Sequence, residues 1–212
     1  MYVHPAFKIT NAEAIEHLRQ RAFGLLVLPT SDAPTASHLP FLIDEQPTGK
    51  VRIALHVARA NRLHTLIGTG CKVLLVCQGP DAYISPDWYT VANQVPTWTY
   101  TSVHVTGTAV VLPEQDTLQH VDKLSACFEQ RLLPKKPWTI AKLDAARRDA
   151  MLKAIVSIVI NVECIEAQKK LIQHKGETEH RGTIDGLRSR DDPSSHAIAA
   201  MIEEMAIQKF GR

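Results

Sequence analysis

Three short segments of the 212-residue chain concentrate the side chains that could bind a ligand. The first, residues 37–41, has the sequence Ser-His-Leu-Pro-Phe. The second, residues 56–61, ends a predicted strand with a histidine, an arginine and an asparagine. The third, residues 78–104, holds two of the three tryptophans and three of the four tyrosines. These segments are more polar and more aromatic than simple connections require.

Two interpretations of the segments stay open on the residues alone. Aromatic side chains of this kind form core clusters, in which case the flanking segments are ordinary loops. They can equally line a flat apolar pocket, with the permanently charged Arg59 available for an anionic group. Tyr100, Ser102, His104 and Thr106 share one face of a predicted strand because side chains alternate along a strand. That polar face therefore lies either against solvent or in a binding site.

The familiar catalytic and nucleotide-binding motifs are absent from the sequence. There is no dinucleotide-binding glycine motif, no P-loop and no nucleophile elbow. No set of acid, base and nucleophile can be identified either. This argues against hydrolysis but not against redox chemistry, which a bound cofactor can supply.

A metal site is not expected. His174 and His180 are six residues apart with a glycine between them, a spacing that does not place them on one helix face. A solvated loop is the favoured interpretation of this stretch. The four cysteines are widely spaced and indicate buried free thiols of a reducing cytoplasm.

Charge and hydropathy restrict the partners. The chain carries 24 basic and 22 acidic residues, so DNA binding is possible but is not supported by charge. Two consecutive helices are predicted between residues 114 and 153, but the long connection with its two prolines is unlike a helix-turn-helix. No apolar run has the length of a membrane span, and no signal peptide is recognised, so a soluble cytoplasmic protein is expected.

Periodicity predicts a chain of short strands interrupted by helices. A capping box at Thr10 and Glu13 begins the first helix, and Pro40 marks its strand as an edge strand or a bulge because proline has no N–H. The helix predicted over 114–131 would bury Leu118, Val121, Leu124 and Phe128. Strands are predicted at 24–28, 38–43, 51–57, 73–77, 97–111 with Gly107 as a bend or a turn, and 155–164. Further helices are predicted at 139–153 and 195–209, and polar, irregular chain at about 173–195.

These elements predict the fold class. Closely spaced strands with irregularly interspersed helices indicate a mainly β, α+β protein, an antiparallel barrel with flanking helices. The expected domain organisation is a barrel domain over residues 1–165. Residues 166–212 are expected to form a polar segment and a helix that packs on the barrel.

Four stretches of the sequence resemble one known family. They are H-V-A-R-A-N (56–61), Q-G-P-D-A-Y-I-S-P-D-W-Y (78–89), V-P-T-W-T-Y-T-S-V-H-V-T-G (95–107) and K-K-L-I-Q (169–173). In order and spacing they are similar to the signatures of the PaiB-type FMN-binding negative transcriptional regulators. The resemblance implies an FMN-binding split β-barrel, related to flavin reductases and pyridoxamine-phosphate oxidases. It also implies a homodimer with FMN at the subunit interface.

The resemblance and the residue chemistry together indicate which side chains hold the cofactor. Arg59 is expected to bind the FMN phosphate, with Asn61 close by as donor and acceptor. The complete expected set is Ser37, His38, Leu39, Pro40, His56, Ala58, Arg59, Asn61, Trp98, Tyr100, Ser102, His104, Lys170 and Gln173.

The sequence departs from the family pattern at three positions. The family usually has asparagine where this chain has Thr99, and serine and asparagine where it has Ile172 and His174. The departures remove two amides and one hydroxyl, which is expected to alter polar contacts at the site.

Three functions follow from these observations. The resemblance implies an FMN-binding regulatory protein. The alternative is an FMN-dependent oxidoreductase, like a flavin reductase or pyridoxamine-phosphate oxidase, acting on a small molecule, because fold does not determine function. A haem-handling or purely structural dimer is a weaker third hypothesis.

Overall fold

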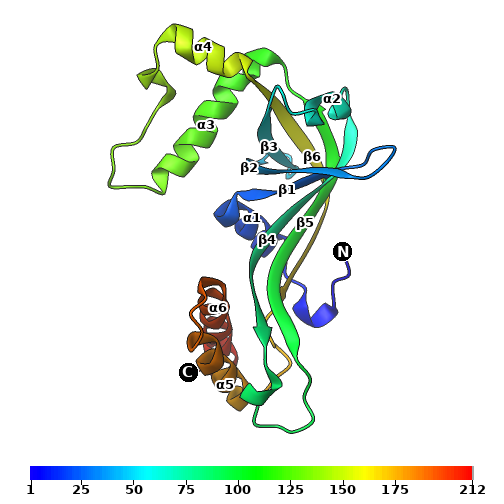
Figure 1. Cartoon of the computed structure of the whole chain (residues 1–212), viewed down its shortest axis with the longest axis vertical. Coiled ribbons are helices and arrows are strands. Elements are labelled where there is room, and N and C mark those ends of the chain that lie inside the picture. The colour runs from blue at the N-terminus through cyan, green and yellow to red at the C-terminus, as the bar shows by residue number, and fades with distance from the viewer. Residues whose placement is uncertain (212) are drawn as a thin grey trace. The chain divides into compact units, whose positions relative to one another are not determined.

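The computed structural model describes residues 1–211 and contains a closed antiparallel barrel with flanking helices, as the sequence predicts (Figure 1). The order of strands around the barrel is β1-β2-β3-β6-β5-β4. The strands are β1 (Phe23–Leu28), β2 (Thr35–Glu45), β3 (Val51–Ala58), β4 (Cys71–Ile84), β5 (Thr97–Val111) and β6 (Ile155–Lys170). The helices are α1 (Asn11–Arg21), α2 (Leu63–Ile67), α3 (Thr117–Gln130), α4 (Ala145–Lys153), α5 (Glu177–Arg188) and α6 (Pro193–Phe210), with short 3-10 turns that include η2 (Pro86–Trp88) and η3 (Glu114–Asp116).

Strand β2 changes partner in its middle. Residues 35–40 pair with β1, and residues 41–45 pair with β3. Pro40 is opposite Phe23 at the end of the first ladder, and the N–H of Phe41 donates to the carbonyl of Ala22 at 3.0 Å. The edge-strand alternative is therefore wrong, since β2 lies between β1 and β3 in the closed barrel, whereas the bulge alternative stays a prediction. Proline is tolerated here because it lies where one ladder gives way to the next.

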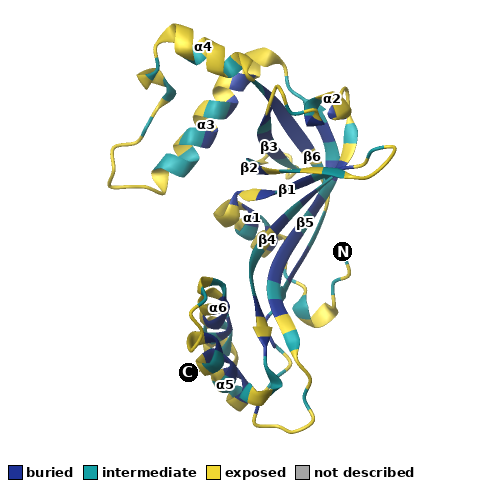
Figure 2. Cartoon of the chain, viewed as in Figure 1, coloured by how far each residue is buried: buried dark blue, intermediate teal, exposed yellow. Residues whose placement is uncertain are grey.

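Burial alternates along β3 and β5, which separates an inner from an outer face of each strand. Figure 2 shows that buried residues predominate in the barrel strands. Ile53, Leu55 and Val57 of β3 are buried, whereas Arg52 and His56 are half-buried. On β5 the odd-numbered residues from 99 to 109 are buried, and most of the even-numbered residues are half-buried. The polar face predicted for β5 is thus the face that points away from the core.

Gly107 does not form a turn in β5, contrary to one of the two expectations. The strand is continuous from Thr97 to Val111, and the neighbouring strand β6 passes very close to the glycine. A Cβ atom at position 107 would lie 2.3 Å from the carbonyl oxygen of Asn161. Glycine is required here because of this close approach of two backbones.

The structure tests the predicted N-terminus of α1 and the predicted buried face of α3. In α1 the predicted capping box forms, with the Thr10 hydroxyl 3.2 Å from the Glu13 N–H and the Glu13 carboxylate 2.8 Å from the Thr10 N–H. In α3, however, Thr117 and His120 are buried beside Leu124, while Leu118 is 42% exposed. The buried face is rotated because α3 packs on the barrel through Thr117, which accepts from the Ser157 hydroxyl, and through His120, which is hydrogen-bonded to His56, rather than through Leu118.

Helix α5 occupies a segment that was expected to be irregular. Residues 177–188 form an amphipathic helix whose buried side includes His180, Thr183, Ile184 and Leu187. The apolar periodicity that predicts a helix is weak in this segment, because several of its buried residues are themselves polar. The expected solvated loop at His180 is therefore wrong.

The chain divides into two compact units. One consists of residues 1–17, 78–103 and 166–212, and the other of residues 18–77 and 104–165. Strands β4, β5 and β6 each contribute residues to both units. The expected domain boundary near residue 165 stays a prediction.

Two glycines of α5 allow Trp88 to pack directly against the helix. A Cβ atom at Gly182 would lie 2.1 Å from the carbonyl oxygen of Trp88, and one at Gly186 would lie 2.3 Å from Cδ2 of its indole. Trp88 in turn packs against a buried apolar cluster that includes Leu187 and Ile198. The glycines therefore join η2 to α5 and α6 within this unit.

We expect the Gly186→Ala variant to be less stable by about 1–2 kcal/mol, because overpacking a filled interior costs up to about 3 kcal/mol. Alanine recovers about 1 kcal/mol of this cost relative to glycine in a helix. Urea denaturation followed by circular dichroism would measure it. The matched control is Asp185→Ala, at an exposed neighbouring position of α5, which should change stability by no more than about 0.5 kcal/mol. A Gly186→Ala variant as stable as the natural protein would contradict the packing argument.

Candidate functional site

The predicted cofactor-binding residues fall into two groups, one in each compact unit. Each group is described by itself. The first group comprises Ser37, His38, Leu39, Pro40, His56, Ala58, Arg59, Asn61 and His104, and the second comprises Trp98, Tyr100, Ser102, Lys170 and Gln173.

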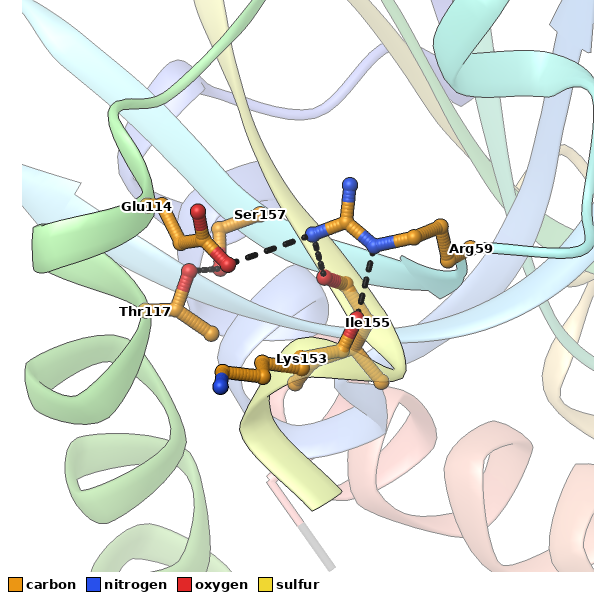
Figure 3. A network of polar contacts seen from close by, with 6 residues as sticks. All are labelled: Arg59, Glu114, Thr117, Lys153, Ile155 and Ser157. Carbon is orange, nitrogen blue, oxygen red and sulfur yellow. Dashed lines mark hydrogen bonds and ion pairs between the residues drawn. The ribbon is translucent and has the colours of Figure 1, made fainter. Parts of the chain in front are cut away.

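Arg59 follows the end of β3 and is held by the junction between α4 and β6 (Figure 3). Its Nε donates to the carbonyl of Lys153 at 2.6 Å, and its Nη2 donates to that of Ile155 at 3.3 Å. The carboxylate of Glu114 lies 3.6 Å from Nη2. The Lys153 carbonyl ends a helix, where carbonyls lack intrahelical partners and favour a cation. Arg59 therefore caps α4, and the remaining nitrogen, Nη1, points away from these contacts.

Ser37 and Asn61 are brought together across the sequence. Nδ2 of Asn61 donates to the Ser37 hydroxyl at 3.0 Å, and Oδ1 of Asn61 accepts from the N–H of Leu63 at 3.0 Å. Asn61 thus links the beginning of β2 to the turn before α2. Since the Ser37 oxygen acts as the acceptor, its own O–H remains able to donate to a ligand.

His56 on the outer face of β3 contacts His120 of α3. Nδ1 of His56 is 3.1 Å from Nε2 of His120, and the two rings meet edge to face. Burial lowers the pKa of His56, and burial together with the neighbouring imidazole lowers the pKa of His120 to about 4. Both rings are therefore neutral at pH 7, and one donates to the other.

The other members of the first group surround these contacts with varied exposure. His38 is exposed and its ring stacks on that of Phe23, with centroids 6.1 Å apart. Leu39 is buried, whereas Pro40 and His104 are half-buried and Ala58 is exposed. Leu39 thus belongs to the core, and its side chain is the least accessible of the group.

The second group lies on β5 and at the end of β6. Nε2 of Gln168 donates to the Tyr100 hydroxyl at 2.7 Å, and Nζ of Lys170 donates to Oγ1 of Thr97 at 2.9 Å. Trp98 is 55% exposed and meets the ring of Tyr83 edge to face. These interactions fix the polar face of β5 and leave the indole of Trp98 accessible.

Two further members of the second group are less available to a ligand. Ser102 is buried. The Gln173 side chain accepts from the N–H of Leu171 at 2.8 Å and donates to the carbonyl of Lys169. Gln173 therefore fixes the local backbone after β6.

The departures from the family pattern lie in different surroundings. Thr99 and Ile172 are fully buried, and the Thr99 hydroxyl donates to the carbonyl of Ala82 at 3.1 Å. Ile172 has a φ of 60°, a left-handed conformation that is rare for a β-branched residue. His174 is exposed. Two of the three departures thus change the core of their unit rather than its surface.

His120 is the main polar residue of the first group's unit that sequence reasoning missed. It lies four residues before Leu124, so both project from one side of α3. This spacing could have indicated burial of His120. Its contact with His56 could not be foreseen because 64 residues separate the two.

The described residues provide no group of three side chains suited to hold a metal ion. His180 is fully buried on α5, and its Nδ1 is 2.7 Å from the carbonyl of Gly176. Among the helices within residues 1–211, none combines the length and the apolar character that a membrane span requires.

The lowered pKa of His120 predicts a loss of stability in acid. The folded state favours the neutral ring, so stability is complete above about pH 6.5 and falls as the pH approaches 4. Between pH 7 and pH 5 the natural protein should lose about 2 kcal/mol more than the His120→Gln variant, which cannot titrate. Denaturation at both pH values measures this difference. His196→Gln, at an exposed position of α6, is the control, and equal losses in the natural protein and His120→Gln would disprove the assignment.

A family model and a known relative each match most of the sequence. The family model described as "Putative FMN-binding domain" matches residues 1–164. The protein named "Protease synthase and sporulation protein PAI 2" from Bacillus subtilis (strain 168) is 32% identical over 205 residues, which cover 96% of this chain and 97% of that protein.

Solved structures share the fold at low sequence identity. The FAD and haem binding protein of Mycobacterium smegmatis has a TM-score of 0.54 at 13% identity, covering 76% of this chain and 71% of that one. A conserved hypothetical protein of Mycobacterium tuberculosis has a TM-score of 0.54 at 15% identity, covering 80% and 91%. With the family model and the Bacillus relative both spanning most of the sequence, the chain belongs to the FMN-binding domain family, of the PaiB-like type, and its cofactor is FMN.

Proposed function

We propose that the protein is a homodimeric regulator of the PaiB type that binds FMN through the Ser37, Arg59 and Asn61 group. The relative named PAI 2 aligns over nearly the whole chain, which supports this function over others of the same fold. When bound, FMN supplies hydride or electron transfer. The protein supplies the binding groups and their orientation.

The donors of this group fit the phosphate of FMN. Arg59 is held by Lys153 and Ile155 through two of its nitrogens, which leaves Nη1 directed away from the protein contacts. The Ser37 hydroxyl accepts from Asn61 and can donate outward. A fixed guanidinium and a hydroxyl donor are suited to bind phosphate oxygens, because charge-assisted hydrogen bonds are strong and little side-chain entropy remains to be lost.

Exposed aromatic and aliphatic side chains support a homodimer. Tyr83 and Trp98 form an accessible pair on one unit, and Phe23 and Leu66 are exposed on the other. Accessible rings of this size are unfavourable in a monomer, whereas permanent dimers bury such residues.

Regulation through strong, direct DNA binding is not supported by the charged residues. Outside residues 165–212, the only adjacent basic pairs in the sequence are Lys135-Lys136 and Arg147-Arg148. Lys135 is paired with Glu129, and Arg148 with Asp149 at 3.0 Å. A basic side chain that is already paired with a carboxylate of the protein neutralises DNA phosphates poorly, so it releases few counterions from DNA and adds little affinity. We therefore propose that regulation is indirect or requires a partner.

The Arg59→Ala variant should bind FMN more weakly by about 1.5–3 kcal/mol, the range for hydrogen bonds to a charged group. Fluorescence titration of FMN measures the change, and denaturation shows whether loss of the α4 cap has unfolded the variant. Arg62→Ala removes an exposed arginine three residues away and should leave affinity unchanged. Equal affinities of the natural protein and a folded Arg59→Ala variant would exclude Arg59 from the site.

Light scattering at micromolar concentration should give twice the chain mass of 23.5 kDa. A Trp98→Ser variant should shift the equilibrium towards the monomer, because it removes an accessible ring. Asp185→Ala, at an exposed polar position of α5, is the control and should leave the mass unchanged. A monomeric mass for the natural protein would refute the dimer.

In a mobility-shift assay at ~150 mM salt, the pure protein should bind DNA of random sequence only weakly. Specific regulators reach nanomolar affinity under such conditions. Nanomolar, sequence-selective binding would show that regulation is direct. Oxidation of NAD(P)H by the same FMN-loaded sample would instead support the alternative function, an FMN-dependent oxidoreductase.

A further inference from the structure

A cavity of about 350 Å³ lies between the outer face of the barrel and α3. Its walls come from β2, β3 and β6 on one side and from η3 and α3 on the other. All of its residues belong to the unit formed by residues 18–77 and 104–165. The volume is within the range of small-molecule sites, which combine an apolar surface with a few convergent polar groups.

Arg52 is the least satisfied polar group in this cavity. Its side chain is half-buried, and its Nε is shielded from solvent without a hydrogen-bond partner. Within residues 1–211 no ion pair involves Arg52. Its cross-strand neighbour Asp44 accepts instead from Nε2 of Gln46 at 2.6 Å. Because a guanidinium stays charged and Arg52 has no ion-pair partner among the described residues, the part of its side chain that lines the cavity favours an oxygen acceptor from outside the chain.

The charges around Arg52 restrict the acceptor. Lys123 provides a second cation at the cavity, whereas Asp44 and Asp116 provide two carboxylates. The four charges balance, so a phosphate group with nearly two negative charges would meet repulsion from both aspartates. A single carboxylate can pair bidentately with the guanidinium of Arg52 at a lower electrostatic cost.

The remaining surface is suited to an apolar body. Ala54, Leu112 and Val159 line the cavity with aliphatic groups, and Val159 is buried. His120, which is only 6% exposed, also lines it, and its Nε2 is engaged with His56. The neutral state of His120, which follows from its lowered pKa, keeps a third positive charge out of the cavity.

We propose that this cavity binds a small monocarboxylate with an aliphatic body, with the carboxylate on Arg52 and the body against Ala54, Leu112 and Val159. The site is separate in its residues from the group proposed for FMN, and the inference does not depend on flavin binding. Lys123 is a second, more exposed cation for the same carboxylate.

Calorimetric titration of the full-length protein with hexanoate tests the proposal. We expect saturable binding in the millimolar range or tighter, weakened at least about tenfold in Arg52→Gln, the lower bound for loss of a charge-assisted hydrogen bond. Arg52→Lys, which retains the charge but not the bidentate geometry, should be intermediate. Arg147→Gln removes an exposed arginine of α4 outside the cavity and should bind hexanoate as the natural protein does. Circular dichroism of each variant checks folding.

Two further probes identify the recognised group. Hexylamine has the same aliphatic body with a cation and should not bind, and inorganic phosphate should not displace hexanoate. Absence of hexanoate binding, equal binding by a folded Arg52→Gln variant, or displacement by phosphate would each overturn the proposal. FMN titration of the same samples is a separate measurement, so failure of one site is distinguishable from failure of the other.

Discussion

The closure of the barrel is the constraint on which the other features depend. A closed barrel needs every strand to pair on both sides, and β2 achieves this by exchanging β1 for β3 between Pro40 and Phe41. Pro40, which has no N–H to donate, therefore lies at the end of the ladder between β1 and β2. Closure also forces close approach elsewhere, as at Gly107, where the backbone of β6 excludes any side chain.

Because closure gives every strand an inner and an outer face, polar chemistry is confined to alternate positions. Arg52 and His56 both project outward from β3, on the same face of the strand. Helix α3 covers this outer face through His120 and through Thr117, whose hydroxyl is 3.2 Å from that of Ser157. Arg59, just beyond the last residue of β3, is fixed by the carbonyls at the end of α4. The position of each polar group thus follows from the strand or helix end that carries it.

Much of this arrangement could be predicted where the pattern is local. The alternation from Val51 to Val57 and the capping box of α1 are short-range signals, and the structure confirms both. The buried face of α3 was predicted only in part: Leu124 is buried as expected, whereas the burial of Thr117 depends on its distant contact with Ser157 of β6. Helix α5 was missed because Gly182 and Gly186 weaken a helical pattern, and only the packing of Trp88 explains their presence. The contacts of Arg59 span more than ninety residues, beyond any motif.

The left-handed backbone at Ile172 has a consequence for sequence change in the segment after β6. The conformation there favours glycine or asparagine, whereas the surrounding cluster of Leu171, Ile184 and Ile198 favours a bulky aliphatic side chain. No single residue type meets both demands, and the unfavourable backbone costs about 1–2 kcal/mol. A small polar residue in place of Ile172 would relieve the backbone but leave interior volume that only the neighbouring side chains of α5 and α6 could fill.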